Sequence, residues 1–347
     1  MSEIYLVFVV FLFVLAVFDL MVGVSNDAVN FLNSAIGAKV AKFRTIIIVA
    51  AVGVFMGATM SNGMMEVARN GVFHPAMFSL KELMFIFLAV MISDVILLDI
   101  FNNLGLPTST TVSLVFELLG GTTAFVLLKL ANDTTGLTVG DLMNTEKALG
   151  MIMAIFVSVA IAFFFGIVLQ YISRLVFTFT YKKNLKWKIG IFGGVATTAI
   201  FYFMLFKGIK SMSFVTPEIY EYIQNHTLTI LGICFLASTA IMQFLYFLKV
   251  NVFKILVLMG TFALAMAFAG NDLVNFIGVP LAGYSAYTDF AASGASDPST
   301  FMMSSLEGPA KSPMIFLVAA GAVMVFSLAT SKKAHNVIKT SVDLSRQ

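Results

Sequence analysis

The chain has 347 residues, of which 59% are hydrophobic and only 11% are charged. An average soluble domain carries about 25% charged residues, so this composition argues against a soluble enzyme, a nucleic-acid-binding protein and a secreted disulfide scaffold. The net charge of +3 is modest, and the single cysteine, Cys234, leaves no partner for an intrachain disulfide. The sequence is that of an integral membrane protein.

Nine apolar stretches are long enough to span a bilayer, since about 20 apolar residues cross the hydrocarbon core as a helix. They are 4–24, 45–68, 83–103, 112–131, 148–175, 189–206, 227–248, 252–270 and 314–330. The stretches lack the alternation of barrel strands and are too long for them. We therefore expect an all-α membrane protein with about nine transmembrane helices.

Basic residues in the connections predict the orientation, because Lys and Arg accumulate on the cytoplasmic side. With the N-terminus outside, a minority of the 21 basic residues fall on the outer side: Arg69, Lys81, Lys129, Lys147, Lys207, Lys210 and Lys311. The other basic residues fall on the inner side. We expect a multi-pass protein of the plasma (inner) membrane, surrounded by the lipid bilayer, with its N-terminus outside.

Two connections, residues 25–44 and 271–294, are too apolar for solvated loops and too polar for lipid-facing helices. Polar, glycine-containing backbone lies at membrane depth only where protein or a watery cavity satisfies it. We therefore expect re-entrant or broken-helix segments in both connections, with a transport site beside them.

The same two connections share a motif. Residues 26–31, Asn-Asp-Ala-Val-Asn-Phe, recur as residues 271–276, Asn-Asp-Leu-Val-Asn-Phe, at an offset of 245 residues. In the expected topology the two copies end helices of opposite direction, which predicts an inverted-topology repeat. The chain then divides into a first repeat (1–131), connecting spans with a basic cytoplasmic loop (132–226) and an incomplete second repeat (227–347).

The polar residues of the motif are suited to ions. Asn26 and Asn30 are four residues apart and share a helix face, and Asp27 lies beside them. Carboxylate and amide oxygens suit a hard cation such as sodium, whereas amide N–H groups donate to an anion. The alternative is that these asparagines join helices by hydrogen bonds. The duplication and the intramembrane carboxylate favour the functional interpretation.

A run of hydroxyls, Leu-Pro-Thr-Ser-Thr-Thr at residues 106–111, separates two apolar stretches. Its hydroxyl groups can donate to oxyanion oxygens, and Pro107 leaves N–H groups free at the start of the next helix. An ordinary proline-initiated turn with a Ser or Thr helix cap explains the run equally well. Both interpretations stay open at this point.

Five further acidic residues lie within the predicted spans, and each should point into the bundle because a lipid-facing charge is costly. They are Asp19, Glu66, Asp94, Asp99 and Glu117. Glu66 follows Asn62 by one helical turn on a span rich in small residues, so we expect it to bind a cation or gate the site. For Asp94, Asp99 and Glu117, structural pairing is an equal alternative.

Residues 23–30, their echo at 270–275 and the run at 107–111 together resemble the PiT family of inorganic phosphate transporters. The resemblance implies a secondary active transporter that carries phosphate in symport with Na+ or H+ and has no other cofactor. It implies that Asp27, Asn30, Asp272 and Asn275 form the ion and phosphate site, with Na+ at Asp27 and Asp272. It also implies phosphate contacts from Ser109, Thr110 and Thr111, to which we add Asn26 and Asn271.

The chain departs from the family pattern at two points. Val112 stands where the family hairpin usually has a histidine, and the second half has no Pro-x-Ser-Thr-Thr. The repeat offset would place a second hairpin near residue 352, beyond Gln347. We therefore expect the native protein to continue past Gln347, and residues 1–347 alone to be poorly active.

Three alternatives complete the hypotheses drawn from the sequence. A permease of the same fold could carry sulfate or another oxyanion, and an anion channel could use the same polar residues. A membrane enzyme would need a nucleophile–base or metal constellation, which the sequence does not present. We expect no nucleic-acid partner, and a homodimer is left open.

Overall fold

The computed structural model describes residues 2–61, 67–132, 136–178, 185–204, 216–308 and 312–344. Within these ranges the regular secondary structure is helical. The long helices are α1 (Ser2–Gly37), α2 (Phe43–Met60), α3 (Leu80–Leu104), α4 (Thr110–Ala131), α6 (Thr145–Phe177), α9 (Thr227–Phe247) and α10 (Val252–Ser293). The shorter ones are η1 (Val67–Gly71), η2 (Pro75–Met77), α5 (Val139–Leu142), α7 (Lys188–Phe203), α8 (Pro217–Asn225), η6 (Ser304–Glu307), α11 (Met314–Thr330) and α12 (Lys332–Leu344).

The seven long helices are each apolar enough to cross a membrane, which confirms the expected all-α membrane class. Helices α11 and α12 form a further candidate span, bent by 66° at Ser331, and α7 is a shorter apolar helix. Each of the nine predicted stretches overlaps a helix. The described residues give seven or eight candidate spans where about nine were expected, because α7 has only 16 residues. The stretch 45–68 is longer than its helix, because α2 ends at Met60.

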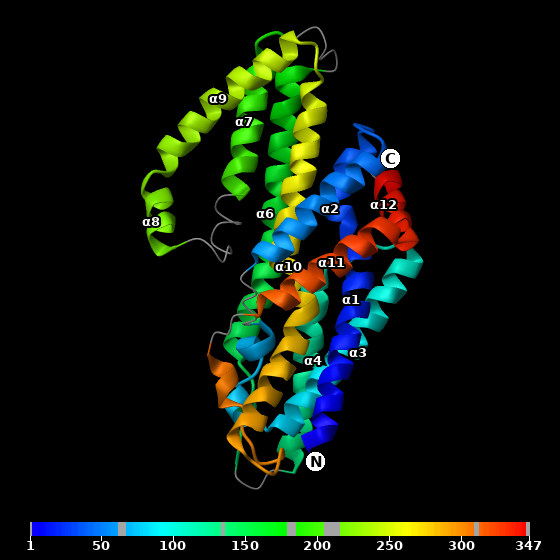
Figure 1. Ribbon diagram of the computed structural model, residues 1–347, viewed down its shortest axis with the longest axis vertical. Coiled ribbons are helices and arrows are strands. Elements are labelled where there is room, and N and C mark those ends of the chain that lie inside the picture. Colours follow the sequence, from blue (N-terminus) through cyan, green and yellow to red (C-terminus); the bar gives the residue numbers. More distant parts are fainter. Residues whose placement is uncertain are drawn as a thin grey trace.

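Helices α1 and α10 form the axis of the structure and run in opposite directions (Figure 1). The lower half of α10 lies with α1, α3 and α4, and its upper half lies with α6, α7 and α9. Helices α2 and α11 lie side by side across the middle. In α2, Gly53 and Gly57 lie directly against the backbone of α10, where a Cβ atom would collide. Small residues allow such close helix approach in membranes.

Helix α6 has a different environment, since Ala148 and Phe177 are its only residues buried in the protein. Three consecutive aromatic side chains, Phe163, Phe164 and Phe165, are all exposed. An apolar surface of this kind is stable against hydrocarbon and unstable against water. The described residues therefore leave α6 uncovered along most of its length.

The structure differs from the sequence expectation at the two polar segments. Residues 25–37 continue α1 as helix, and residues 271–293 continue α10 as helix, with Pro280 inside it. The polar side chains of α1 find partners on neighbouring elements, so the backbone stays in its own helical hydrogen bonds. The break in a span lies instead between α11 and α12.

The segment after α11 forms the helix α12, which packs against α1 and α3. Ala334, Val337, Ile338 and Val342 are buried along one face of α12. This amphipathic pattern explains how a polar, basic sequence forms a helix that covers the end of α1.

Candidate functional site

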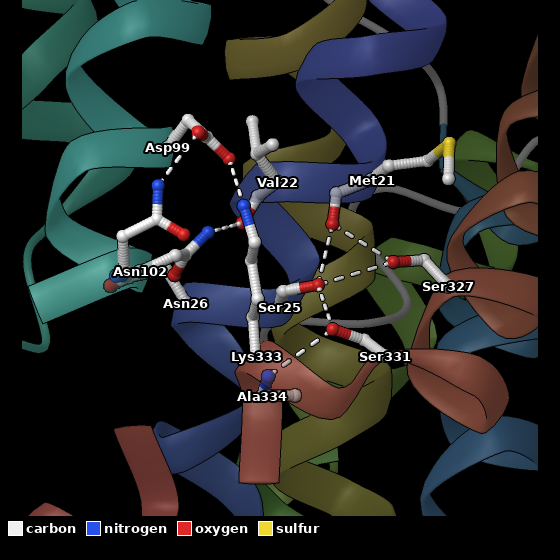
Figure 2. Close-up of polar contacts among 11 residues, drawn as sticks. Met21, Val22, Ser25, Asn26, Asp99, Asn102, Ser327, Ser331, Lys333 and Ala334 are labelled. Carbon is white, nitrogen blue, oxygen red and sulfur yellow. Dashed lines mark hydrogen bonds and ion pairs between the residues drawn. The ribbon is translucent and has the colours of Figure 1, made fainter. Parts of the chain in front are cut away.

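The turn between α3 and α4 is attached to α1 through Asn26, which is fully buried. The Asn26 Nδ2 donates to Asn102 Oδ1 at 2.9 Å and to the carbonyl of Leu106 at 3.0 Å. The backbone N–H of Thr108 donates to Asn26 Oδ1 at 2.7 Å. Asn102 in turn donates to the carbonyl of Val22 at 2.7 Å (Figure 2). This network fixes the hydroxyl run beside the middle of α1.

The fixed turn places a hydroxyl on the carboxylate of Asp27, which is 2% exposed. Helix α3 ends at Gly105, whose φ of 67° is readily adopted by glycine, and Ser109 caps α4. Thr110 therefore lies in the first turn of α4, and its Oγ1 donates to Asp27 Oδ2 at 2.8 Å. Asn30 donates to the other oxygen at 3.3 Å. Both oxygens of Asp27 are thus approached by donors.

Helix α10 completes this junction from the opposite side. Asn275 Nδ2 donates to Thr111 Oγ1 at 2.8 Å and to Thr110 Oγ1 at 3.4 Å. One turn earlier on α10, the carboxylate of Asp272 lies close enough for its charge to act on Asp27. The two copies of the motif therefore meet across the start of α4.

A cavity of about 300 Å³ adjoins this junction. Polar groups enter it from both helices, with Asn30 on α1 and Asn271 and Asp272 on α10, while Phe31 and Phe268 form apolar walls. Since water occupies about 30 Å³ per molecule, the cavity can hold a small oxyanion together with a cation and water. Among the described residues that line it, none is Lys, Arg or His.

A hydrogen-bonded cluster supports the other side of α1 (Figure 2). Ser25 Oγ lies 2.7 Å from Ser331 Oγ, at the bend between α11 and α12, and 3.4 Å from Ser327 Oγ. Just beyond the bend, Lys333 forms an ion pair with Asp99 of α3. The C-terminal helices are thereby attached to the helix that carries Asp27.

Most of the predicted site residues are brought together by this arrangement. At the junction of the three helices lie Asp27, Asn30, Thr110, Thr111 and Asn275, and beside them in the cavity wall lie Asn271 and Asp272. Along the chain these residues are separated by up to 248 positions, the distance from Asp27 to Asn275.

Two predicted site residues, Asn26 and Ser109, have other surroundings. The side chain of Asn26 is occupied by the turn, and exposed Ser109 accepts from the N–H of Val112 at 3.3 Å as a helix cap. Glu66 lies outside the residues that the structure describes. Asn102, which sequence reasoning did not select, holds the turn together with Asn26. The feature of the sequence that could have pointed to Asn102 is a pair of adjacent asparagines, 102 and 103, shortly before Gly105 and Pro107.

Residues 23–341 match the family described as the phosphate transporter family, so the match runs from just before Asp27 into α12. The chain belongs to this family. Its members are transporters, which confirms the assignment of the chain to transport and not to catalysis.

A solved structure titled "The sodium-dependent phosphate transporter" is similar in fold, with a TM-score of 0.67 and 19% sequence identity. The similarity covers 97% of this chain and 78% of the other. Comparison with curated protein sequences gives no match.

Proposed function

We propose that the chain is a secondary active transporter that carries inorganic phosphate together with Na+ across the plasma membrane. The observation that carries this proposal is the meeting of Asp27 and Asp272 with amides and hydroxyls beside a cavity whose described lining residues include no Lys, Arg or His. Membership of the phosphate transporter family supports the anion. The fold shared with the sodium-dependent transporter supports the cation.

Electrostatics explains why the two ions would travel together. Two unit charges 4 Å apart interact by about 4 kcal/mol at an effective dielectric constant of about 20. An anion beside Asp27 or Asp272 would lose affinity by about a thousandfold for each uncompensated carboxylate. A sodium ion held by these carboxylates removes this repulsion, and phosphate in turn stabilises the bound sodium. The binding of each ion therefore favours the other.

We assign separate roles to the residues around the cavity. Asp27 and Asp272 bind Na+, and Asn30, Asn271 and the hydroxyl of Thr111 donate to phosphate. Thr110 and Asn275 hold these groups in register through their contacts with each other and with Asp27. Asn26 and Ser109 position the turn, because their polar atoms are already engaged with its backbone.

Uptake by the native-length protein, purified and reconstituted in liposomes, tests this function. Radiolabelled phosphate should accumulate against its gradient when sodium is higher outside, and potassium in place of sodium should abolish accumulation. Preferential accumulation of sulfate would identify the permease for another oxyanion. Sodium-independent flux that never exceeds equilibrium would identify the channel, and in either case phosphate symport would be rejected.

We further propose that the N-terminus lies outside. Support comes from a cavity of about 990 Å³ lined by Lys39, Arg174, Lys249 and Lys254, four basic residues predicted to lie inside. Single cysteines in place of Lys39 and Lys254, in a Cys234→Ala background, should react with an impermeant thiol reagent only from the cytoplasmic side. Labelling of either one from the outside would overturn this orientation.

A further inference from the structure

Helices α1 and α4 carry a second layer of polar side chains, displaced along both helices from the junction at Asp27. On α4, Thr110, Ser113 and Glu117 follow one another at helical spacing and share a face. On α1, Asp19 precedes Asp27 by eight residues, a distance of about 12 Å along a helix. Helices α1 and α4 run in opposite directions (Figure 1). Earlier residues of α1 therefore lie beside later residues of α4. Asp27 and Thr110 form one layer of polar side chains, and Asp19, Ser113 and Glu117 form the next.

Three carboxyl groups meet in this second layer, which we call the carboxyl triad: Asp19 of α1, Asp94 of α3 and Glu117 of α4. Asp19 and Asp94 are fully buried, and the carboxyl group of Asp19 lies close enough to those of Asp94 and Glu117 for their charges to act on it. Ser113 Oγ lies 2.6 Å from Asp94 Oδ1 and 2.9 Å from Glu117 Oε1.

These contacts need more hydrogens than ionised carboxylates supply. The hydroxyl of Ser113 has one hydrogen and an ionised carboxylate has none, so Ser113 can donate to only one of its two neighbours. Its other contact therefore requires a proton on a carboxyl group. Neither carboxyl oxygen of Asp19 receives a hydrogen bond from a protein donor, and one oxygen each of Asp94 and Glu117 is likewise buried without a donor.

Among the described residues, the surroundings of the triad supply no positive charge to replace this proton. The charged groups that act on the triad are its own members and Asp27. On the neighbouring elements within the described residues, Asp272 of α10 acts on Asp27, and Lys333 of α12 is paired with Asp99. The described acidic and histidine side chains form no group with the geometry of metal ligands. The arrangement therefore favours protons over a metal ion.

We propose that Asp19, Asp94 and Glu117 form a proton-binding site, separate from the sodium and phosphate site. Glu117 is the point of exchange, because it lines a cavity of about 450 Å³ together with Ser113 and Thr108. Asp19 and Asp94 lie behind it without exposure. Protons enter from this cavity and keep the triad largely neutral.

This site has a consequence for transport, which rests on the proposed function. Loss of a proton adds a negative charge about 12 Å from the position of Asp27. At an effective dielectric constant of about 20, that charge weakens the binding of a univalent anion by about tenfold. The triad therefore lowers phosphate affinity as the pH rises and its protons leave.

Infrared spectroscopy of the purified full chain tests the proton site directly. At neutral pH exposed carboxyl groups are ionised, so absorption by protonated carboxyl groups should come from buried ones. Glu117→Gln and Asp94→Asn should each reduce this absorption, whereas Asp99→Asn, which alters a half-exposed carboxylate paired with Lys333, should leave it unchanged. Spectra of Glu117→Gln and Asp94→Asn that coincide with wild type would overturn the proposal.

Uptake measurements then test the consequence at saturating sodium. The rise in KM for phosphate from mildly acidic to alkaline pH should be about tenfold smaller in Glu117→Gln than in wild type and Asp99→Asn. Ionisation of phosphate itself affects all three proteins equally. An unchanged pH profile in Glu117→Gln would overturn the link to transport. Absence of uptake by wild type would overturn the proposed function, and the infrared result would still decide the proton site.

Discussion

Asn26 and Asn30 are equivalent in sequence spacing but not in the structure, and their replacement by alanine should separate the two roles. Asn26 is fully buried and makes three hydrogen bonds, to Asn102, Leu106 and Thr108. Asn30 is exposed and makes one long hydrogen bond of 3.3 Å to Asp27. Asn26→Ala should therefore loosen the turn that carries the hydroxyl run.

The expected magnitude follows from the number of bonds. Hydrogen bonds between helices in membranes contribute about 0.6 kcal/mol on average and up to about 1.7 kcal/mol. Three such bonds give a loss of roughly 2–5 kcal/mol for Asn26→Ala, with the upper end favoured because Asn102 keeps a buried acceptor without its donor. Asn30→Ala loses one long bond and should cost under about 1 kcal/mol.

Unfolding of the purified proteins in detergent, by heat and by denaturant, measures this difference. Asn26→Ala should unfold at a clearly lower temperature than wild type, and Asn30→Ala should unfold close to it. In phosphate uptake, Asn30→Ala should raise KM, since its side chain faces the cavity. Equal stability of the two variants would refute the assignment of Asn26 to the turn.

Two further predictions concern charge and packing. Asp27→Asn and Asp272→Asn keep the side-chain volume and remove the charge. Each should therefore abolish sodium-dependent uptake while the protein still reaches the membrane. A variant with near wild-type uptake would show that its carboxylate is structural. Gly57→Ala should destabilise the protein by about 1–3 kcal/mol, because its Cβ would collide with the backbone at Met266. The control is Gly260→Ala, whose added Cβ atom meets no atom within 4 Å. This change should be neutral or slightly stabilising in thermal unfolding. Equal effects of the two glycine changes would contradict the close packing of α2 on α10.

The membrane class and the positions of the spans could be read directly from the sequence. Burial in hydrocarbon requires about 20 consecutive apolar residues, and this requirement is local, so each of the nine stretches overlaps a helix. The motif at residues 26–31 and its copy at 271–276 likewise indicated where polar groups would gather. Spacing along one helix also placed Asp27 and Asn30 within hydrogen-bonding reach of each other.

Long-range packing decided what the individual polar residues do. Local sequence gave no reason to separate Asn26 from Asn30, because the difference lies in the α3–α4 turn more than 70 residues later, at Asn102 and Thr108. The same holds for Asp19, Asp94 and Glu117, which lie on three helices and meet only when α1, α3 and α4 pack. Hydropathy depends on neighbours in the chain, whereas hydrogen bonds and charge interactions depend on neighbours in space. The sequence by itself therefore determined the membrane helices and the polar motif, and the tertiary structure alone decided which polar groups face the cavity, which hold the turn and which buried carboxyl groups lie together.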